Sequence, residues 1–306
     1  MNNMSSNIHL FFTMTSERKV KLKVIKTEAD YDADKVLGRK LFPELYSNIY
    51  IAGRKKSGKT QLLYNILERC ANKSTKVMLF SATVNKDATY KEIIKMLDRK
   101  KIDHGEFEHF INEEGEDLLA GFIAQAKERT AEEEEEEAPK PTSRKYVSKE
   151  EARIIFGDEL PSEEIQAQQA KDAAKEAEEA AKKKKKKGAG KKILAPEYIL
   201  CFDDLGDDLR KKAVSQLLIK NRHYKCKVII LSQWITYLPP TAIRQLDYVL
   251  LFGGFAGEKL EDLHTKLDLS DTFEEFEKRY KQATEQKYHF LYIDIASNEY
   301  RNDFNR

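Results

Sequence analysis

Residues 53–60 constrain the fold most strongly, because they fit a phosphate-binding pattern at every fixed position. They read GRKKSGKT and match G-x-x-x-x-G-K-[ST]. A β-prone segment, residues 48–52, precedes them, and residues 61–67 follow with the apolar spacing of a helix. A strand, a glycine-rich turn and a helix in this order present backbone N–H groups to an anion. The pattern predicts a nucleoside triphosphate site rather than a lysine-rich turn.

The motif predicts a role for its residues. Lys59 is expected to reach the β- and γ-phosphates, and the hydroxyl of Thr60 is expected to bind Mg²⁺. The full nucleotide-binding set predicted from the motif is Gly53, Arg54, Lys55, Lys56, Ser57, Gly58, Lys59, Thr60 and Gln61.

Composition narrows the class of protein. The 306 residues carry a formal charge of +2, so a nucleic-acid partner must be argued from local patches. Three scattered cysteines (Cys70, Cys201 and Cys226) fit a reducing compartment and exclude a disulfide framework or zinc finger. No apolar run reaches membrane-spanning length, and the cluster at residues 8–12 is too short for a signal peptide.

Strands and helices are expected to alternate along the chain. Apolar, β-prone runs predict strands at residues 75–81, 197–204, 227–233, 247–252 and 288–294, and alternation predicts another at 20–26. Helical spacing is found at residues 90–97, 117–128, 207–224 and 241–246 and within 257–284. This order predicts an α/β fold with a mostly parallel central sheet covered by helices on both faces.

A charged, low-complexity insertion interrupts this pattern. Residues 132–137 are all glutamate, Pro139 and Pro141 follow, and an Ala/Glu/Lys tract ends in lysines 182–187. The tract favours helix but has no apolar face to bury, so it is expected to be partly helical or disordered. The lysines suit nucleic acid, a membrane surface or an import receptor, or they are simply solvated. We therefore divide the P-loop domain into 1–130 and 193–306, with the insertion at 131–192.

An acidic pair follows the apolar run at residues 199–202. Asp203 and Asp204 form a Walker B signature, which predicts Asp203 as a magnesium ligand and Asp204 as the group that activates the attacking water. Capping of the next helix is the alternative. Gln233 ends the next apolar strand, where additional-strand P-loop ATPases keep a polar sensor of the γ-phosphate.

Phosphoryl transfer also needs positive charge on the γ-phosphate. Arg222, just before the sensor strand, and Arg244, just after a double proline, are candidates for an arginine finger. Arg54 is a third candidate, inside the P-loop itself. The expected catalytic set is therefore Lys59, Asp204, Gln233, Arg222 and Arg244.

The sequence also contains two patterns of guanine-nucleotide-binding proteins, but the position of the second argues against that function. Residues 203–206 also fit D-x-x-G, and residues 265–268 (TKLD) fit the base-reading pattern [NT]-K-x-D. That pattern should end a buried strand, whereas residues 258–264 have the composition of an exposed helix. ATP is therefore the expected nucleotide.

Three segments together carry a family resemblance: residues 53–60, residues 199–204, and residues 221–233 (NRHYKCKVIILSQ) followed by 238–244 (LPPTAIR). The chain resembles the virion DNA-packaging ATPases of poxviruses and other large DNA viruses, in the FtsK–HerA superfamily. The resemblance implies a RecA-like sheet, ATP hydrolysis with Mg²⁺, and the roles given above for Lys59, Thr60, Asp203, Asp204 and Gln233. One departure is Asp204, where the superfamily commonly has Glu.

The resemblance also implies partners. A ring-shaped homo-oligomer would thread double-stranded DNA into a preformed capsid, contacting capsid or portal-vertex proteins in the host-cell cytoplasm, a viral factory or the virion. Two other classes stay open: another P-loop enzyme, helicase-like or a nucleoside kinase, and a nucleotide-dependent scaffold protein.

Overall fold

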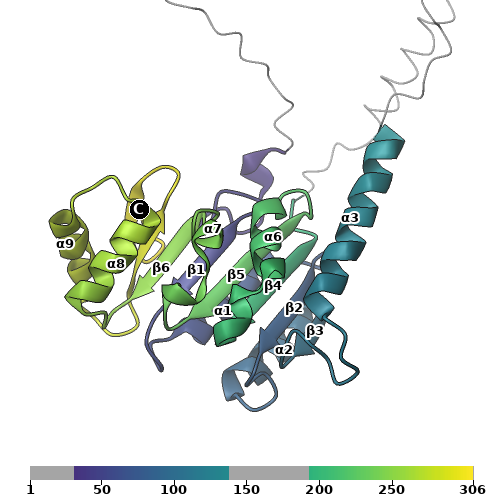
Figure 1. The fold of residues 1–306 in the computed structure, drawn as a ribbon, viewed down its shortest axis with the longest axis horizontal. Helices are drawn as coiled ribbons and strands as arrows, with labels where there is room; N and C mark the ends of the chain where they lie inside the picture. The colour runs from purple at the N-terminus through teal and green to yellow at the C-terminus, as the bar shows by residue number, and fades with distance from the viewer. Residues whose placement is uncertain (1–30, 138–192, 306) are drawn as a thin grey trace, which may run out of the picture. The chain divides into compact units, whose positions relative to one another are not determined.

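The computed structural model describes residues 31–137 and 193–305. From Ala33 onward these residues form one unit around a sheet of eight strands (Figure 1). The strand order is β3-β2-β4-β5-β1-β6-β7-β8. The strands are β1 Asn48–Ala52, β2 Lys76–Ser81, β3 Asp103–Phe107, β4 Tyr198–Asp203, β5 Cys226–Ser232, β6 Tyr248–Phe252, β7 Phe290–Asp294 and β8 Glu299–Asn302.

The first six strands of the chain are parallel, and the last two are antiparallel. β5 pairs with β1 on one side and with β4 on the other, so it separates the P-loop strand from the acidic strand. β6 is the second neighbour of β1, and it pairs with antiparallel β7. The predicted α/β class with a mostly parallel sheet is confirmed.

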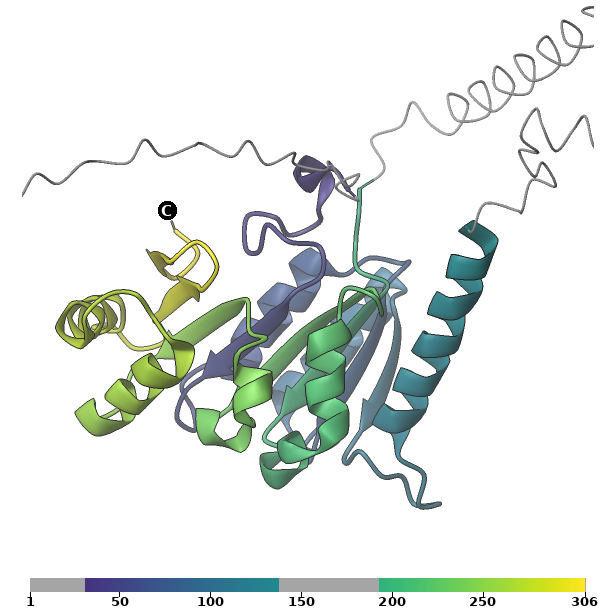
Figure 2. The same ribbon diagram turned by 45° about the horizontal axis from the view of Figure 1, so that its top comes forward.

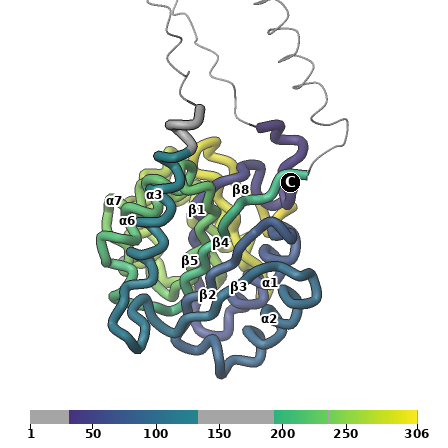
Figure 3. Tube along the Cα trace, turned by 90° about the vertical axis from the view of Figure 1, so that its right-hand side faces the viewer, coloured from purple at the N-terminus to yellow at the C-terminus, as the bar shows by residue number. Residues whose placement is uncertain are grey.

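Helices cover both faces of the sheet, as Figures 2 and 3 show. Alternate residues of each strand point to opposite faces, so Ile49 and Ile51 pack with α1 and α2, whereas Tyr50 and Ala52 pack with the helices of the other face. The helices are α1 Lys59–Cys70 and α2 Ala88–Lys100 on the first face, and α3 Leu118–Glu137, α6 Lys212–Lys220, α7 Pro240–Ile243, α8 Gly257–Leu267 and α9 Phe273–Ala283 on the second.

Several predicted elements differ from those observed. The single helix expected at 207–224 is a 3-10 turn, Gly206–Arg210, followed by α6, because Lys211 between them has an extended backbone. β3 and β8 were not predicted, since both are edge strands with few apolar residues. α3 also runs across the boundary placed between residues 130 and 131.

The remaining predictions concern the cysteines, membrane-spanning segments and segments outside the described residues. Cys70, Cys201 and Cys226 are free and buried. Across residues 31–137 and 193–305, no helix has the length and apolar character to cross a membrane. The strand expected at 20–26, the prolines at 139 and 141 and the lysines at 182–187 lie outside the described residues.

Candidate nucleotide-binding site

The predicted site residues gather at the carboxyl edge of the parallel strands. Residues 53–58 leave the end of β1, Asp203 is the last residue of β4, and Gln233 directly follows the end of β5. Since β5 lies between β1 and β4, the sensor position falls between the P-loop and the acidic pair. The fold thus brings together three motifs that are far apart in the sequence.

Two glycines, Gly53 and Gly58, permit the tight backbone turn of the P-loop. A Cβ atom at Gly53 would lie 2.4 Å from Ser57 Oγ and 2.9 Å from Phe252 Cβ, so a side chain does not fit there. Gly58 caps α1 with a left-handed backbone, φ 107°. The loop therefore ends at the N-terminus of α1, and the N-terminus of a helix is favourable for an anion.

Lys59, the first residue of α1, is buried at this edge. Its Nζ donates to the carbonyl oxygens of Gly53, at 2.9 Å, and Arg54, at 3.3 Å. Burial lowers the pKa of Lys59, and the nearby Asp204 and Asp203 oppose that shift. A phosphate oxygen would be a stronger, charge-assisted acceptor than these two carbonyls.

Asp203 is a buried carboxylate. Its Oδ2 accepts a hydrogen bond of 2.7 Å from the hydroxyl of Tyr90, on α2. Burial raises the pKa of Asp203 to about 6, whereas the Tyr90 hydrogen bond acts to lower it. Carboxylate and hydroxyl oxygens are the ligands that Mg²⁺ prefers, so Asp203 and Thr60 suit this ion. Nothing in the sequence pointed to Tyr90, because its contact with Asp203 spans α2 and β4.

Asp204 and Gln233 contact each other at the surface. Gln233 Nε2 donates to the Asp204 carboxylate, at 3.1 Å from Oδ2 and 3.3 Å from Oδ1. Asp204 has a left-handed backbone, φ 51°, which is uncommon outside glycine and is tolerated by Asp. This conformation ends the strand and leaves the carboxylate exposed, where it is able to orient a water molecule.

The two candidate finger arginines lie at the opposite edge of the sheet. Arg222 precedes β5 and pairs with Glu44, Nη2 to Oε2 at 3.2 Å. Arg244 ends α7, next to Gln245, whose carbonyl accepts from Asn48 at the start of β1. Parallel strands begin at the amino edge, so neither arginine completes the nucleotide site of its own chain. Action on a neighbouring chain stays a prediction.

The alternative guanine-reading residues do not follow a buried strand. Thr265 and Lys266 lie on α8, and Asp268 caps its C-terminus. Lys266 forms an ion pair with Asp262, one turn earlier on the same helix. The TKLD segment is thus part of a surface helix, as the sequence predicted.

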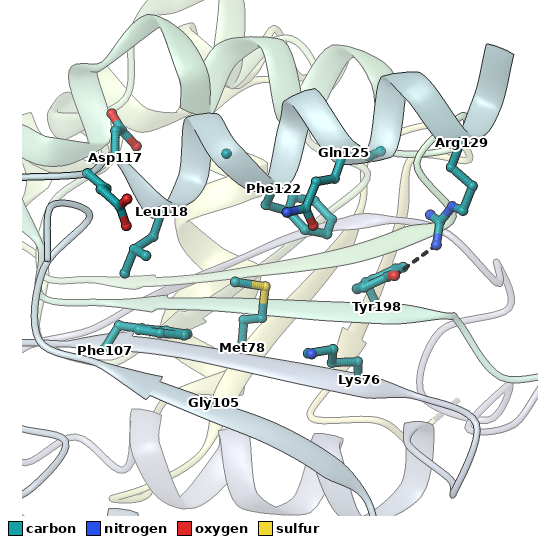
Figure 4. A pocket seen from close by; sticks show the side chains of 13 residues that line it. Lys76, Met78, Gly105, Phe107, Asp117, Leu118, Phe122, Gln125, Arg129 and Tyr198 are labelled. Atoms are coloured by element: carbon teal, nitrogen blue, oxygen red, sulfur yellow. Dashed lines mark hydrogen bonds between the residues drawn. The ribbon is translucent and has the colours of Figure 1, made fainter. Parts of the chain in front are cut away.

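A cavity of about 650 Å³ lies elsewhere, under α3 (Figure 4). Phe122 and Gln125 of α3 face Met78 and Phe107 of the sheet, and Arg129 donates to the hydroxyl of Tyr198 at 2.8 Å. None of the predicted nucleotide or metal residues lines this cavity. The cavity under α3 is therefore separate from the candidate nucleotide site.

Comparison with protein families confirms the resemblance over part of the chain. Residues 162–293 match the model of the family described as Poxvirus A32 protein. The matched segment contains Asp203, Asp204 and Gln233, and it does not include the P-loop. The chain matches no curated protein sequence.

Solved structures provide more distant similarities. The genome packaging NTPase B204 from Sulfolobus turreted icosahedral virus 2, in complex with AMPPCP, is 14% identical, with 84% of this chain and 97% of that chain covered and a TM-score of 0.45. The cytoplasmic domain of the Type VII secretion ATPase EccC from Thermomonospora curvata is 13% identical, with 81% and 24% covered and a TM-score of 0.40.

Proposed function

We propose that this chain is an ATP-hydrolysing motor that moves double-stranded viral DNA into a preformed capsid. The observation that carries the proposal is the meeting of Lys59, Asp203, Asp204 and Gln233 at one sheet edge, in a chain whose residues 162–293 match the poxvirus A32 family. The first part supports hydrolysis, and the family match supports DNA packaging.

Hydrolysis is divided among the residues of this edge. Lys59 exchanges its two carbonyl contacts for phosphate oxygens and neutralises their charge. Thr60 and Asp203 would hold Mg²⁺, which would supply charge neutralisation to the phosphates. Asp204 orients the attacking water and accepts its proton. The aspartate side chain is one methylene shorter than glutamate, and the left-handed backbone of Asp204 sets where its carboxylate lies.

Gln233 links the nucleotide to the rest of the domain. Its amide nitrogen donates to Asp204, and a γ-phosphate would offer that nitrogen a competing acceptor. Gln233 directly follows β5, the strand between β1 and β4. Exchange of Asp204 for a phosphate as its hydrogen-bond partner would therefore shift the end of a central strand. This is the role of a sensor that reports hydrolysis to the DNA-contacting parts.

The assembly proposed with this function is a homo-oligomeric ring. Arg222 and Arg244 lie at the amino edge, so an arginine for the γ-phosphate has to come from another chain or from Arg54. Capsid or portal-vertex proteins would receive the ring, in the host-cell cytoplasm, a viral factory or the virion.

The test is ATPase activity of the full chain with and without double-stranded DNA, over a range of salt concentrations. We expect DNA to stimulate hydrolysis and the effect to weaken as salt rises, because DNA affinity depends on phosphate contacts. Size measurement with bound ATP tests the ring. ATP hydrolysis that DNA stimulates at no salt concentration would contradict the motor, and phosphate transfer to a small acceptor would identify a kinase instead.

A further inference from the structure

A second cavity, of about 380 Å³, borders the P-loop on the side away from Asp203. Its walls are residues 54–57, the end of β6 at 252–254, and the segment 284–288 that leads into β7. We propose that this cavity holds the nucleoside half of the nucleotide and that the ring of Tyr288 stacks on its base. The inference rests on the proposed function and extends it to nucleotide recognition.

Tyr288 has the geometry of a stacking platform. The residue is 60% exposed, and its backbone is left-handed, with φ 73°. A Cβ atom at Gly58 would lie 3.3 Å from Tyr288 Cδ1, so the ring stands beside the first turn of α1. Exposing a large aromatic ring on a strained backbone is unfavourable in the free chain, and such strain is typical of ligand-binding positions.

The direction of the nucleotide also favours this cavity. Asp203, Asp204 and Gln233 lie toward β4 and β5, so the γ-phosphate and the attacking water belong on that side of the P-loop. The other end of the triphosphate must leave toward β6, the second neighbour of β1, and the cavity opens there.

Lining groups suit a nucleoside next to phosphates. Lys287 Nζ lies over one face of the Tyr288 ring, 4.6 Å from its centroid, so a base that stacks on this face would take the place of the ammonium group. Lys55 and Lys56 add positive charge near the phosphate end. Glu285, also in the lining, supplies a carboxylate of the kind that accepts hydrogen bonds from ribose hydroxyls. Charge and hydrogen-bonding groups are therefore both present for a sugar and a base.

The walls are held in place without a ligand. The hydroxyl of Tyr280, on α9, donates to the carbonyl of Phe252 and accepts from the amide of Phe255, both at 3.0 Å. Asp303 accepts from the amide of Phe290 at 3.1 Å and contacts His289 Nδ1 at 2.6 Å. The end of β6 and the residues that follow Tyr288 are thus fixed, which lowers the cost of ordering them on binding.

The test compares ATP, GTP and inorganic tripolyphosphate by titration calorimetry with the full chain, in Mg²⁺. We expect Tyr288→Ala to weaken ATP and GTP binding about tenfold, because base–aromatic stacking is strong and tolerant of the base. Binding of tripolyphosphate should change less than about twofold by the same reasoning. Tyr288→Phe should keep wild-type affinity. Ile219→Ala, at another exposed apolar side chain, is the matched control.

Two outcomes would overturn the inference. One is unchanged ATP affinity in Tyr288→Ala, including the case where affinity for double-stranded DNA falls instead. The other is an equal loss for ATP and tripolyphosphate, which would assign the ring to the phosphates. Lys59→Ala separates failure of the base-site inference from failure of the proposed function. If Lys59→Ala abolishes ATP binding while Tyr288→Ala has no effect, the proposed motor function stands and the base site does not. If wild type binds no ATP, both fail.

Discussion

The two edges of the parallel sheet each bury a lysine, and they hold it differently. At the carboxyl edge, Lys59 Nζ contacts carbonyl oxygens of its own loop. At the amino edge, Lys227 Nζ donates to the carbonyl of Glu44 at 2.9 Å and to Ser47 Oγ at 2.7 Å, and lies 5.4 Å from the ring centroid of Phe42. Burial lowers the pKa of both lysines.

The surrounding hydrogen bonds explain the difference. Hydrogen bonds at the amino edge join the starts of the strands. The Asn48 side chain donates to the carbonyls of Leu218 and Gln245, and the Asn48 backbone amide donates to Asp247. Lys227 adds its bonds to Glu44 and Ser47. At the carboxyl edge, Lys59 lies near the charges of Asp204 and Asp203, beside the proposed phosphate site. The proposed function implies that the amino edge serves stability and the carboxyl edge serves binding, and substitutions should separate the two.

The largest effect is expected from Lys59→Ala. ATP hydrolysis should fall at least about 100-fold, because the charge that stabilises the transferring phosphoryl group is lost. The free energy of unfolding should change by less than about 1 kcal/mol, since removing a desolvated ammonium offsets the lost contacts. Steady-state ATPase assays and urea denaturation measure the two quantities. A large loss of stability would mean that Lys59 is as structural as Lys227.

Lys227→Ala should give the reverse pattern. We expect the free energy of unfolding to fall by about 3 kcal/mol, because the cavity and the unsatisfied acceptors at Glu44 and Ser47 cost more than removal of the desolvated ammonium returns. The affinity of the folded protein for ATP should stay the same, because the carboxyl edge is untouched. Urea denaturation and calorimetry measure both, with Lys220→Ala, an exposed lysine on α6, as the control. A variant of full stability that loses ATP binding would invalidate the contrast.

The same contrast explains what the sequence could predict. The P-loop, the acidic pair and Gln233 were predicted to lie together because phosphate chemistry requires those residue types next to strand ends, and the structure places them at one edge. Arg222 and Arg244 were placed with them because they are near the sensor strand in sequence. Both precede the start of a parallel strand, however, and strand starts lie at the other edge. Closeness to the sensor strand in sequence did not indicate whether an arginine lies at the carboxyl edge or the amino edge of the sheet.

Residues that reach the candidate site through tertiary contacts could not be predicted. Tyr90 meets Asp203 from a helix that is 113 residues away in sequence, and Tyr288 approaches Gly58 from the segment before antiparallel β7. Neither contact leaves a local pattern. β3 and β8 were missed for a related reason: edge strands need few apolar residues, so their sequences resemble loops.

A smaller effect is expected at the carboxyl edge from Tyr90→Phe, which removes the hydroxyl bonded to Asp203. Loss of this charge-assisted hydrogen bond costs about 1–2 kcal/mol. If the bond positions Asp203 for Mg²⁺, the Mg²⁺ concentration for half-maximal ATPase activity should rise about fivefold or more. Direct Mn²⁺ binding in the presence of ATP should weaken in parallel.

Tyr224→Phe is the matched control for that change. Tyr224 is also a buried tyrosine, and within the described part of the chain its hydroxyl has no hydrogen-bond partner. Its loss should leave the metal dependence unchanged. Equal effects of the two substitutions would show that Tyr90 acts through packing and not through Asp203.

The smallest effect concerns the pH dependence of the amino edge. Burial raises the pKa of Asp247 from 3.8 to about 6, although the amide of Asn48 and the charges of Arg222 and Lys227 act to lower it. Because the folded state holds this proton more tightly than the unfolded state, the contribution to stability is full below pH 4 and is lost as the pH rises through 6. Asp247→Asn keeps an acceptor for Asn48 and removes the titration.

The stability of Asp247→Asn relative to wild type should therefore increase between pH 4 and pH 6. The shift corresponds to about 3 kcal/mol, and partial exposure of the side chain reduces the expected gain to about 1–2 kcal/mol. Urea denaturation of both proteins at several pH values gives the difference directly. A difference that stays constant over this range would show that the proton on Asp247 is not linked to folding. The amino edge would then stabilise the sheet through its hydrogen bonds alone.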